Sequence, residues 1–169
     1  MTQPVDTDKV LNDLANGLSA HLSTFSAQEP LMIGIHSGGV WIAERLHQQL
    51  GLKEPLGHLD ISFYRDDFSR IGMNPQVKPS HLPFSVDDRH IILVDDVLYT
   101  GRTIRAALNE IFDYGRPATV SLAVLIDRGG RELPVEANVT GLKIELASGE
   151  NIKLKGPEPL SLQIAKKGE

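Results

Sequence analysis

Cysteine is absent from this chain of 169 residues. Its absence excludes a disulfide scaffold, a zinc site built from thiolates and a cysteine nucleophile. An excess of positive charge is also lacking, because 17 Lys and Arg face 22 Asp and Glu, for a formal net charge of −5. That balance argues against a protein that holds nucleic acid by its phosphates alone, but it leaves a local basic face open.

Long hydrophobic runs are missing as well, since no stretch approaches the roughly 20 apolar residues that span a bilayer. The segment from Met1 to Asp6 has neither the basic nor the apolar region of a signal peptide. We therefore expect no membrane partner and a place in the cytoplasm. With 41% hydrophobic and 23% charged residues, the chain is expected to form a single domain over residues 1–169.

The spacing of apolar residues in the first part of the chain predicts a helix, a strand and a second helix. Apolar side chains recur on one helical face from Leu11 to Phe25. Residues 31–36 form a short apolar run of the length of a buried strand, and residues 37–39 read as a turn. Helical spacing then returns and ends at Gly51.

A second strand, turn and helix follow further along the chain. Residues 90–94 are continuously apolar, as in a strand that is covered on both faces, and two aspartates end the run. The positions from Ile104 to Phe112 give the clearest helix, and residues 120–126 predict another buried strand. Repeated strand–helix units predict an α/β fold with a central, mostly parallel sheet flanked by helices.

Two further segments complete the prediction. Residues 56–64 resemble a strand, and the charged, proline-containing residues 65–89 predict a long flexible loop of the kind that often closes over a site. Near the end of the chain, residues 151–155 and 160–164 alternate enough to predict a closing hairpin.

The segment from Val94 to Thr103 contains the most informative chemistry. Asp95 and Asp96 leave a buried strand, and a tight loop containing Thr100 and Gly101 leads into a helix. Backbone N–H groups at such a helix start bind anions, while the two carboxylates suit hydroxyl groups, Mg²⁺ or developing positive charge. A ribose 5-phosphate satisfies both halves of this pattern.

An ordinary turn after an acidic strand end is the alternative interpretation. It leaves unexplained why two large side chains, Leu98 and Tyr99, stand in the turn.

The segment resembles the signature for phosphoribosyl pyrophosphate (PRPP) of type I phosphoribosyltransferases, and more closely that of the PyrR family, the pyr operon attenuation regulators and uracil phosphoribosyltransferases. Supporting segments follow in the family's order at residues 60–67, 115–117 and 125–134. The resemblance covers about residues 31–140. It implies a phosphoribosyltransferase core there and a small hood formed by about residues 1–30 and 141–169.

The resemblance implies the reaction of uracil with PRPP to give UMP and diphosphate, with Mg²⁺ carried by PRPP. Asp95 and Asp96 would hold the ribose hydroxyls and stabilise the positive charge of the transition state. The residues implied for binding the 5′-phosphate and the rest of PRPP or UMP are Val97, Leu98, Tyr99, Thr100, Gly101, Arg102 and Thr103.

The other implied residues lie outside this segment. The diphosphate loop would consist of Ser37, Gly38 and Gly39, and such loops often contain a non-proline cis peptide bond. Arg65 would meet the diphosphate, while Asp127 and Arg128 would lie on the side of the base. His36 and His58 are interpreted as packing or surface residues.

The chain departs from the PyrR pattern in the diphosphate loop. The family pattern Thr-Arg-Gly is replaced by Ser37-Gly38-Gly39, so an arginine is missing. Losing a charge-assisted contact costs on the order of 1.5–3 kcal/mol, which corresponds to roughly 10- to 150-fold in PRPP affinity or rate. We therefore expect weakened catalysis.

A second departure concerns RNA, because PyrR proteins are expected to bind the leader RNA of pyrimidine genes. Arg128 and Arg131 are present, but Glu136, Asn138 and Leu142 stand where relatives usually carry basic residues. The RNA partner is thus implied by the family more than by these residues.

Three functions stay open on sequence alone: a catalytic uracil transferase with or without regulation, a UMP- or PRPP-sensing protein with little catalysis, and a transferase for another base. Purine-using relatives often have an acidic residue at the position of Tyr99, so this residue favours a pyrimidine. The family also implies a homodimer or homotetramer, with Trp41 and Tyr99 as candidate interface residues.

Overall fold

The structure is a computed structural model that describes residues 3–25, 29–61 and 80–166. Most of the expected loop over residues 65–89, including Arg65, lies outside the described residues. The strand expected over residues 56–64 is present in part as β3 (Gly57–Leu59), and its last residues also lie outside the described part.

A parallel sheet of five strands forms the centre of the fold, in the order β3-β2-β4-β5-β6. Its remaining strands are β2 (Leu31–Ile35), β4 (His90–Leu98), β5 (Thr119–Asp127) and β6 (Val139–Lys143). This sheet confirms the α/β fold class that the repeated strand–helix units predict.

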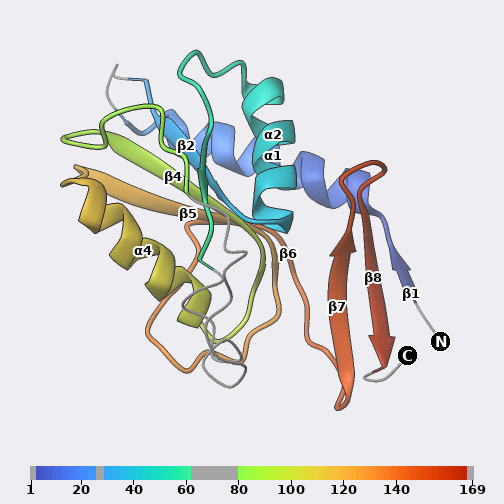
Figure 1. Ribbon diagram of the computed structural model, residues 1–169. Helices are drawn as coiled ribbons and strands as arrows, with labels where there is room; N and C mark the ends of the chain where they lie inside the picture. Colours follow the sequence, from blue (N-terminus) through green and yellow to red (C-terminus); the bar gives the residue numbers. More distant parts are fainter. Residues whose placement is uncertain (1–2, 26–28, 62–79, 167–169) are drawn as a thin grey trace.

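Helices cover both faces of the sheet (Figure 1). They are α1 (Thr7–Leu22) and α2 (Gly38–Leu50) on one face and α4 (Arg102–Tyr114) on the other. None of the helices in the described part of the chain is long and apolar enough to cross a bilayer.

The central strand β4 supplies both cores because successive side chains point to opposite faces of a sheet. Ile92 and Val94 pack in the cluster that contains α1 and α2, whereas Ile91 and Leu93 pack in the cluster under α4. All four side chains are buried. This double burial explains why the strand is apolar at every position rather than at alternate ones.

Phe112 corrects the expected apolar face of α4, because its side chain is 55% exposed. At about 100° per residue, a position eight residues after Ile104 lies about 80° away from it around the helix, whereas Ile111 lies within about 20°. Ile104 and Ile111 are buried accordingly.

Two expected boundaries also differ from the structure. Strand β4 does not end before Asp95, because β5 is equally long and pairs with it as far as Leu98, which lies opposite Asp127. Gly38 is not part of a turn but the first residue of α2. The turn is made by His36 and Ser37, and the bond between them is a non-proline cis peptide, as expected for such a loop.

The ends of the chain form a second, antiparallel sheet in the order β1-β8-β7. Its strands are β1 (Gln3–Val5), β7 (Glu150–Lys155) and β8 (Ser161–Lys166). Strands β7 and β8 confirm the closing hairpin, and the sheet stands to one side of the main sheet (Figure 1). Helix α1 and strand β6 pack together, so these parts of the terminal segments contribute to the main core.

The hydroxyl group of Thr7 connects the two ends of the chain. Its oxygen accepts a hydrogen bond of 2.8 Å from the N–H of Leu162 and donates to the carbonyl of Val5 at 3.2 Å. Thr7 is buried, so a substitution that removes the hydroxyl leaves a buried N–H without its acceptor.

We predict that Thr7→Val lowers the free energy of unfolding by about 1–3 kcal/mol, measured by urea denaturation, because a buried donor loses its partner. Thr7→Ser retains the hydroxyl and serves as the matched control. Equal stability of the Val and Ser variants would contradict this role for the hydrogen bond.

Candidate functional site

The loop that ends β2 and the acidic end of β4 are in direct contact. A Cβ atom added to Gly38 would collide with the Asp96 carboxylate. One added to Gly39 would lie 2.6 Å from the carbonyl oxygen of Val94 and 3.3 Å from Oδ1 of Asp95. The structure therefore brings together two groups of residues that are more than 50 positions apart in the sequence and that the sequence assigns to one site.

This close contact lies at position 38, where the PyrR pattern has an arginine. In the observed arrangement no side chain fits at position 38 unless the Asp96 carboxylate moves. Gly38 thus lacks the positive charge of that arginine. At the same time, it allows the start of α2 to approach the Asp96 carboxylate.

The two aspartates are oriented by the backbone that follows them. Oδ1 of Asp95 accepts from the N–H of Asp96 at 2.8 Å, and Oδ1 of Asp96 accepts from the N–H of Val97 at 2.8 Å. Asp95 is buried with 6% exposure, whereas Asp96 is partly exposed. Asp96 is therefore the more accessible of the two carboxylates to a ligand at the strand end.

A small cavity lies between the end of β4 and the first turn of α4. Its volume is about 110 Å³. The residues that line it are Asp95, Val97, Leu98, Tyr99, Thr100, Gly101, Thr103 and Ile104. Seven of these are site residues expected from the sequence, and Ile104 is the only addition.

The carbonyl groups of the connecting loop bind the segment after β5. The carbonyl of Leu98 accepts from the N–H of Arg128 at 3.1 Å, and the carbonyl of Thr100 accepts from the N–H groups of Glu132 and Leu133 at 2.9 and 3.2 Å. The carbonyl of Tyr99 accepts from the guanidinium of Arg131 at 2.9 Å.

The direction of these carbonyls determines the direction of the loop's donors. In a planar trans peptide the N–H points opposite to the C=O of the preceding residue. The N–H groups of Tyr99, Thr100 and Gly101 therefore point away from the segment that binds the carbonyls. Together with the start of α4, they form a set of donors suited to an anion.

Arg131 ties this loop to the end of β5. Its guanidinium donates to the carboxylate of Asp127 at 2.7 Å and to the carbonyl of Val135 at 2.7 Å, in addition to Tyr99. Asp127 also accepts from the N–H of Gly129 at 3.0 Å. The carboxylate that the sequence assigns to the side of the base thus has internal partners. The four-residue spacing of Asp127 and Arg131 around two glycines was the available sequence signal.

The environment of Asp127 acts on its pKa in two directions. Burial alone raises the pKa of this carboxyl, but the hydrogen bonds from Arg131 and Gly129 and the positive charges of Arg131 and Lys143 outweigh it. The pKa therefore lies below its ordinary value, and the carboxylate is charged at neutral pH.

Arg128 contacts Tyr99 and the small sheet. Its guanidinium carbon lies 4.0 Å from the centre of the Tyr99 ring, and its Nη1 donates to Oδ1 of Asn151 at 2.9 Å. Gly130, with φ of 78°, passes directly over the same ring, where a Cβ would collide. Asn151 is a site residue that the sequence gave no reason to select, because nothing in the pattern of β7 distinguishes it.

A larger hollow opens at the carboxyl ends of β5 and β6, beside Arg128. Its volume is about 500 Å³, within the range of small-ligand pockets. The residues that line it are Asp127, Arg128, Gly129, Gly130, Lys143, Ile144 and Glu145. Ligands of open α/β sheets bind beyond the carboxyl ends of the strands, which is where this hollow lies.

His36, next to the diphosphate loop, belongs to a row of three imidazoles. Its ring centre lies 5.3 Å from that of His58, which in turn lies 6.2 Å from that of His81. Burial, followed by the neighbouring imidazoles, lowers the pKa of His58 against an opposing effect of Glu44. His58 is therefore neutral at neutral pH and does not replace the missing arginine.

The donor set fits Mg²⁺ that arrives with a phosphate ligand. Among residues 3–25, 29–61 and 80–166, no group of three or more acidic or histidine side chains could hold a metal ion. Mg²⁺ commonly binds through one or two carboxylates together with substrate phosphates, and Asp96 provides such a carboxylate.

Comparisons with known proteins identify the family of the chain. Residues 6–159 match the family model described as a phosphoribosyl transferase domain. The chain is 61% identical over 166 residues to the bifunctional protein PyrR of Nitrosococcus oceani, covering 96% of this chain and 94% of that protein. It is 55% identical to the PyrR of Pseudomonas paraeruginosa, covering 92% of this chain and 91% of that protein.

Solved structures support the fold. A hypoxanthine-guanine phosphoribosyltransferase from Bacillus anthracis gives a TM-score of 0.71 at 16% identity and covers 95% of this chain and 96% of its own. A purine phosphoribosyltransferase from Pyrococcus horikoshii gives 0.62 at 26% identity, with coverage of 82% and 83%.

We predict that Gly38→Ala weakens binding of ribose 5-phosphate severalfold in calorimetry, because the added methyl group displaces the Asp96 carboxylate. The melting temperature should change little, since Asp96 is partly exposed and can rotate. Unchanged affinity would show that the contact between Gly38 and Asp96 has no bearing on ligand binding.

The pair of Asp127 and Arg131 predicts a pH-dependent stability. Because the folded pKa of Asp127 is lowered, its contribution is complete above the unfolded value of about 3.9 and is lost as the pH falls through the folded pKa. The difference in unfolding free energy between the natural chain and Arg131→Gln should thus be larger at pH 6 than at pH 3, measured in urea. A constant difference would contradict the ion pair.

Proposed function

The chain belongs to the phosphoribosyltransferase family and, within it, to the PyrR proteins, and on this premise we propose that it transfers the phosphoribosyl group of PRPP to uracil. The products are UMP and diphosphate. The observation that carries the proposal is the junction of β4 and α4, where two carboxylates adjoin a loop whose N–H donors are turned toward one side.

The loop from Val97 to Thr103 holds the 5′-phosphate through these donors and the hydroxyl groups of Thr100 and Thr103. Asp96 and the more deeply buried Asp95 bind the ribose hydroxyls. As the bond from the anomeric carbon to diphosphate breaks, the carboxylates stabilise the positive charge that develops on the ribose. Uracil N1 forms the new bond to the anomeric carbon, and its proton passes to the departing diphosphate or to water.

The diphosphate end of PRPP lies at Ser37, Gly38 and Gly39, where α2 begins without a capping hydrogen bond from the Ser37 side chain. Arg65 is proposed to meet the same group. Asp96 would contact the Mg²⁺ that PRPP carries, and this ion would neutralise part of the diphosphate charge.

The base lies on the side of Tyr99 and Arg128, next to the hollow at the ends of β5 and β6. Tyr99 favours uracil because it offers no carboxylate to a purine ring. The small sheet β1-β8-β7 is proposed as the hood over this end, and Asn151 places it in contact with Arg128.

A protein that senses UMP or PRPP with little catalysis is the second candidate. The observation in its favour is Gly38, since residues 37–39 lack the arginine of the PyrR pattern and His58, whose ring lies near that of His36, is neutral. The site would then bind nucleotide as described but transfer the phosphoribosyl group slowly.

The chain acts as a regulator of pyrimidine biosynthesis, as a member of the PyrR proteins. We propose leader RNA as its partner, a homodimer or homotetramer as its assembly and the cytoplasm as its location. Arg131, one of the two basic residues named for RNA, donates to the carbonyl of Tyr99 within the chain. Asn138, which stands where relatives usually carry basic residues, accepts from the N–H of Leu122 at 2.8 Å. Trp41 packs on Gly156 within the chain, which leaves Tyr99, 49% exposed, as the freer interface candidate.

We predict that the double variant Asp95→Asn, Asp96→Asn reduces uracil-dependent UMP formation from PRPP at least about 100-fold, because the charge of the transition state loses its stabilising carboxylates. Calorimetric UMP binding should fall in parallel. Asp113→Asn, an exposed aspartate on α4, makes the same charge change away from the site and is the control.

The natural chain in the same assay separates the two candidates. Turnover identifies a working uracil phosphoribosyltransferase, whereas UMP binding without turnover identifies the sensing protein. If the double variant binds UMP as the natural chain does, the assignment of the carboxylates is wrong.

A further inference from the structure

Asn151 joins the small sheet to the base side of the site. It lies on β7, and its Oδ1 accepts at 2.9 Å from Nη1 of Arg128, which follows β5. The same oxygen accepts from the N–H of Ile152 at 2.9 Å. Two donors therefore fix the amide with its oxygen toward Arg128.

Arg128 is consequently held from three directions. Its backbone N–H donates to Leu98, its guanidinium lies over the Tyr99 ring, and its Nη1 donates to Asn151. A guanidinium that lies over a ring and also donates a hydrogen bond is restricted in its orientation, because any rotation must keep both contacts.

The guanidinium also has a donor that is not used. Nε of Arg128 is buried and has no hydrogen-bond partner among the described residues. A buried charged donor without an acceptor is unfavourable, so such a group in a site points to an acceptor supplied by a ligand. Uracil carries two carbonyl oxygens, which are acceptors of the required kind.

We propose that Asn151 is a positioning residue for recognition of the base and acts through Arg128, which reads a carbonyl oxygen of uracil. This inference rests on the proposed function. It makes the hood a part of base selection, since the hydrogen bond between Asn151 and Arg128 joins β7 to the main sheet.

The test compares the affinities of UMP and ribose 5-phosphate by calorimetry. Both ligands carry the phosphate and the ribose, so the ratio of their affinities measures the contribution of the base. Asn151→Ala should lower this ratio about tenfold, the effect of one hydrogen bond to a charged group, and leave the affinity for ribose 5-phosphate unchanged.

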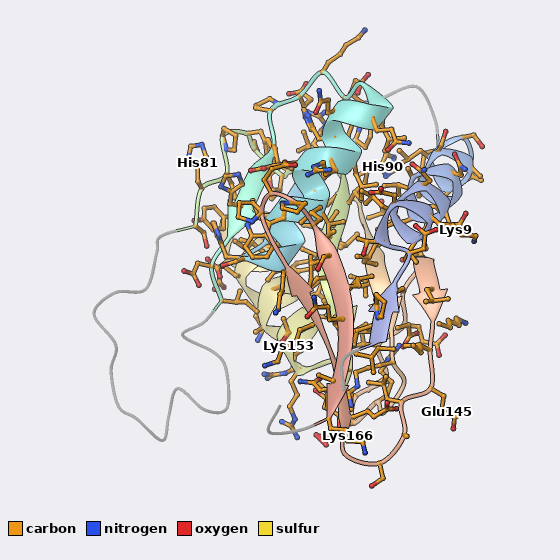
Figure 2. All side chains as sticks on the ribbon, turned by 90° about the vertical axis from the view of Figure 1, so that its right-hand side faces the viewer. Lys9, His81, His90, Glu145, Lys153 and Lys166 are labelled. Carbon is orange, nitrogen blue, oxygen red and sulfur yellow. The ribbon has the colours of Figure 1, made fainter. Side chains whose placement is uncertain are left out.

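Two variants make the test specific. Asn151→Asp retains an oxygen acceptor for Arg128 and should restore the ratio, whereas a merely structural role would not distinguish Asp from Ala in this way. Lys153→Ala alters an exposed residue of the same strand and the same sheet face, labelled in Figure 2, and should leave the ratio unchanged.

The outcomes separate this inference from the proposed function. If Asn151→Ala keeps the ratio of the natural chain, or if the natural chain binds UMP no better than ribose 5-phosphate, the inference is overturned while the phosphate site stands. If the natural chain binds neither ligand, the proposed function itself is wrong.

Discussion

The hydrogen bonds between the carbonyls of residues 98–100 and the segment of residues 128–133 are the constraint on which the site depends. They orient the peptide groups between β4 and α4 so that their N–H donors face one side. They also place Arg128 over Tyr99, because both residues belong to the bonded segments. One set of contacts thus orients both the loop that is proposed to hold the phosphate and the residues that are proposed to face the base.

The other end of the site, at the start of α2, is determined by close packing rather than by hydrogen bonds. Gly39 lies so close to the carbonyl of Val94 that no side chain fits there, and at Gly38 a side chain fits only if the Asp96 carboxylate moves. The presence of glycine instead of arginine at position 38 is therefore linked to the position of the Asp96 carboxylate. In the proposed site the start of α2 offers only backbone donors to the diphosphate, which is why a sensing protein is the second candidate.

The sequence predicts the main sheet well because burial on both faces leaves a continuous apolar run, as in residues 90–94. It places the end of β4 too early, since pairing with β5 depends on a neighbour that is distant in the sequence. Seven of the residues that the motif assigns to the site line one cavity, because the motif is contiguous in the sequence. The contact of Asn151 with Arg128 joins two separate segments, which no local pattern encodes, whereas the internal pairing of Asp127 with Arg131 spans only four residues and leaves a local signal.

The most direct test of the account is a crystal structure of the chain with UMP. The account predicts that the phosphate lies at the N–H groups of residues 99–103, with the ribose hydroxyls at Asp96 and the carbonyls of residues 98–100 still bound to residues 128–133. A phosphate bound instead in the hollow beside Lys143, or a loop whose carbonyls have turned toward the ligand, would contradict it.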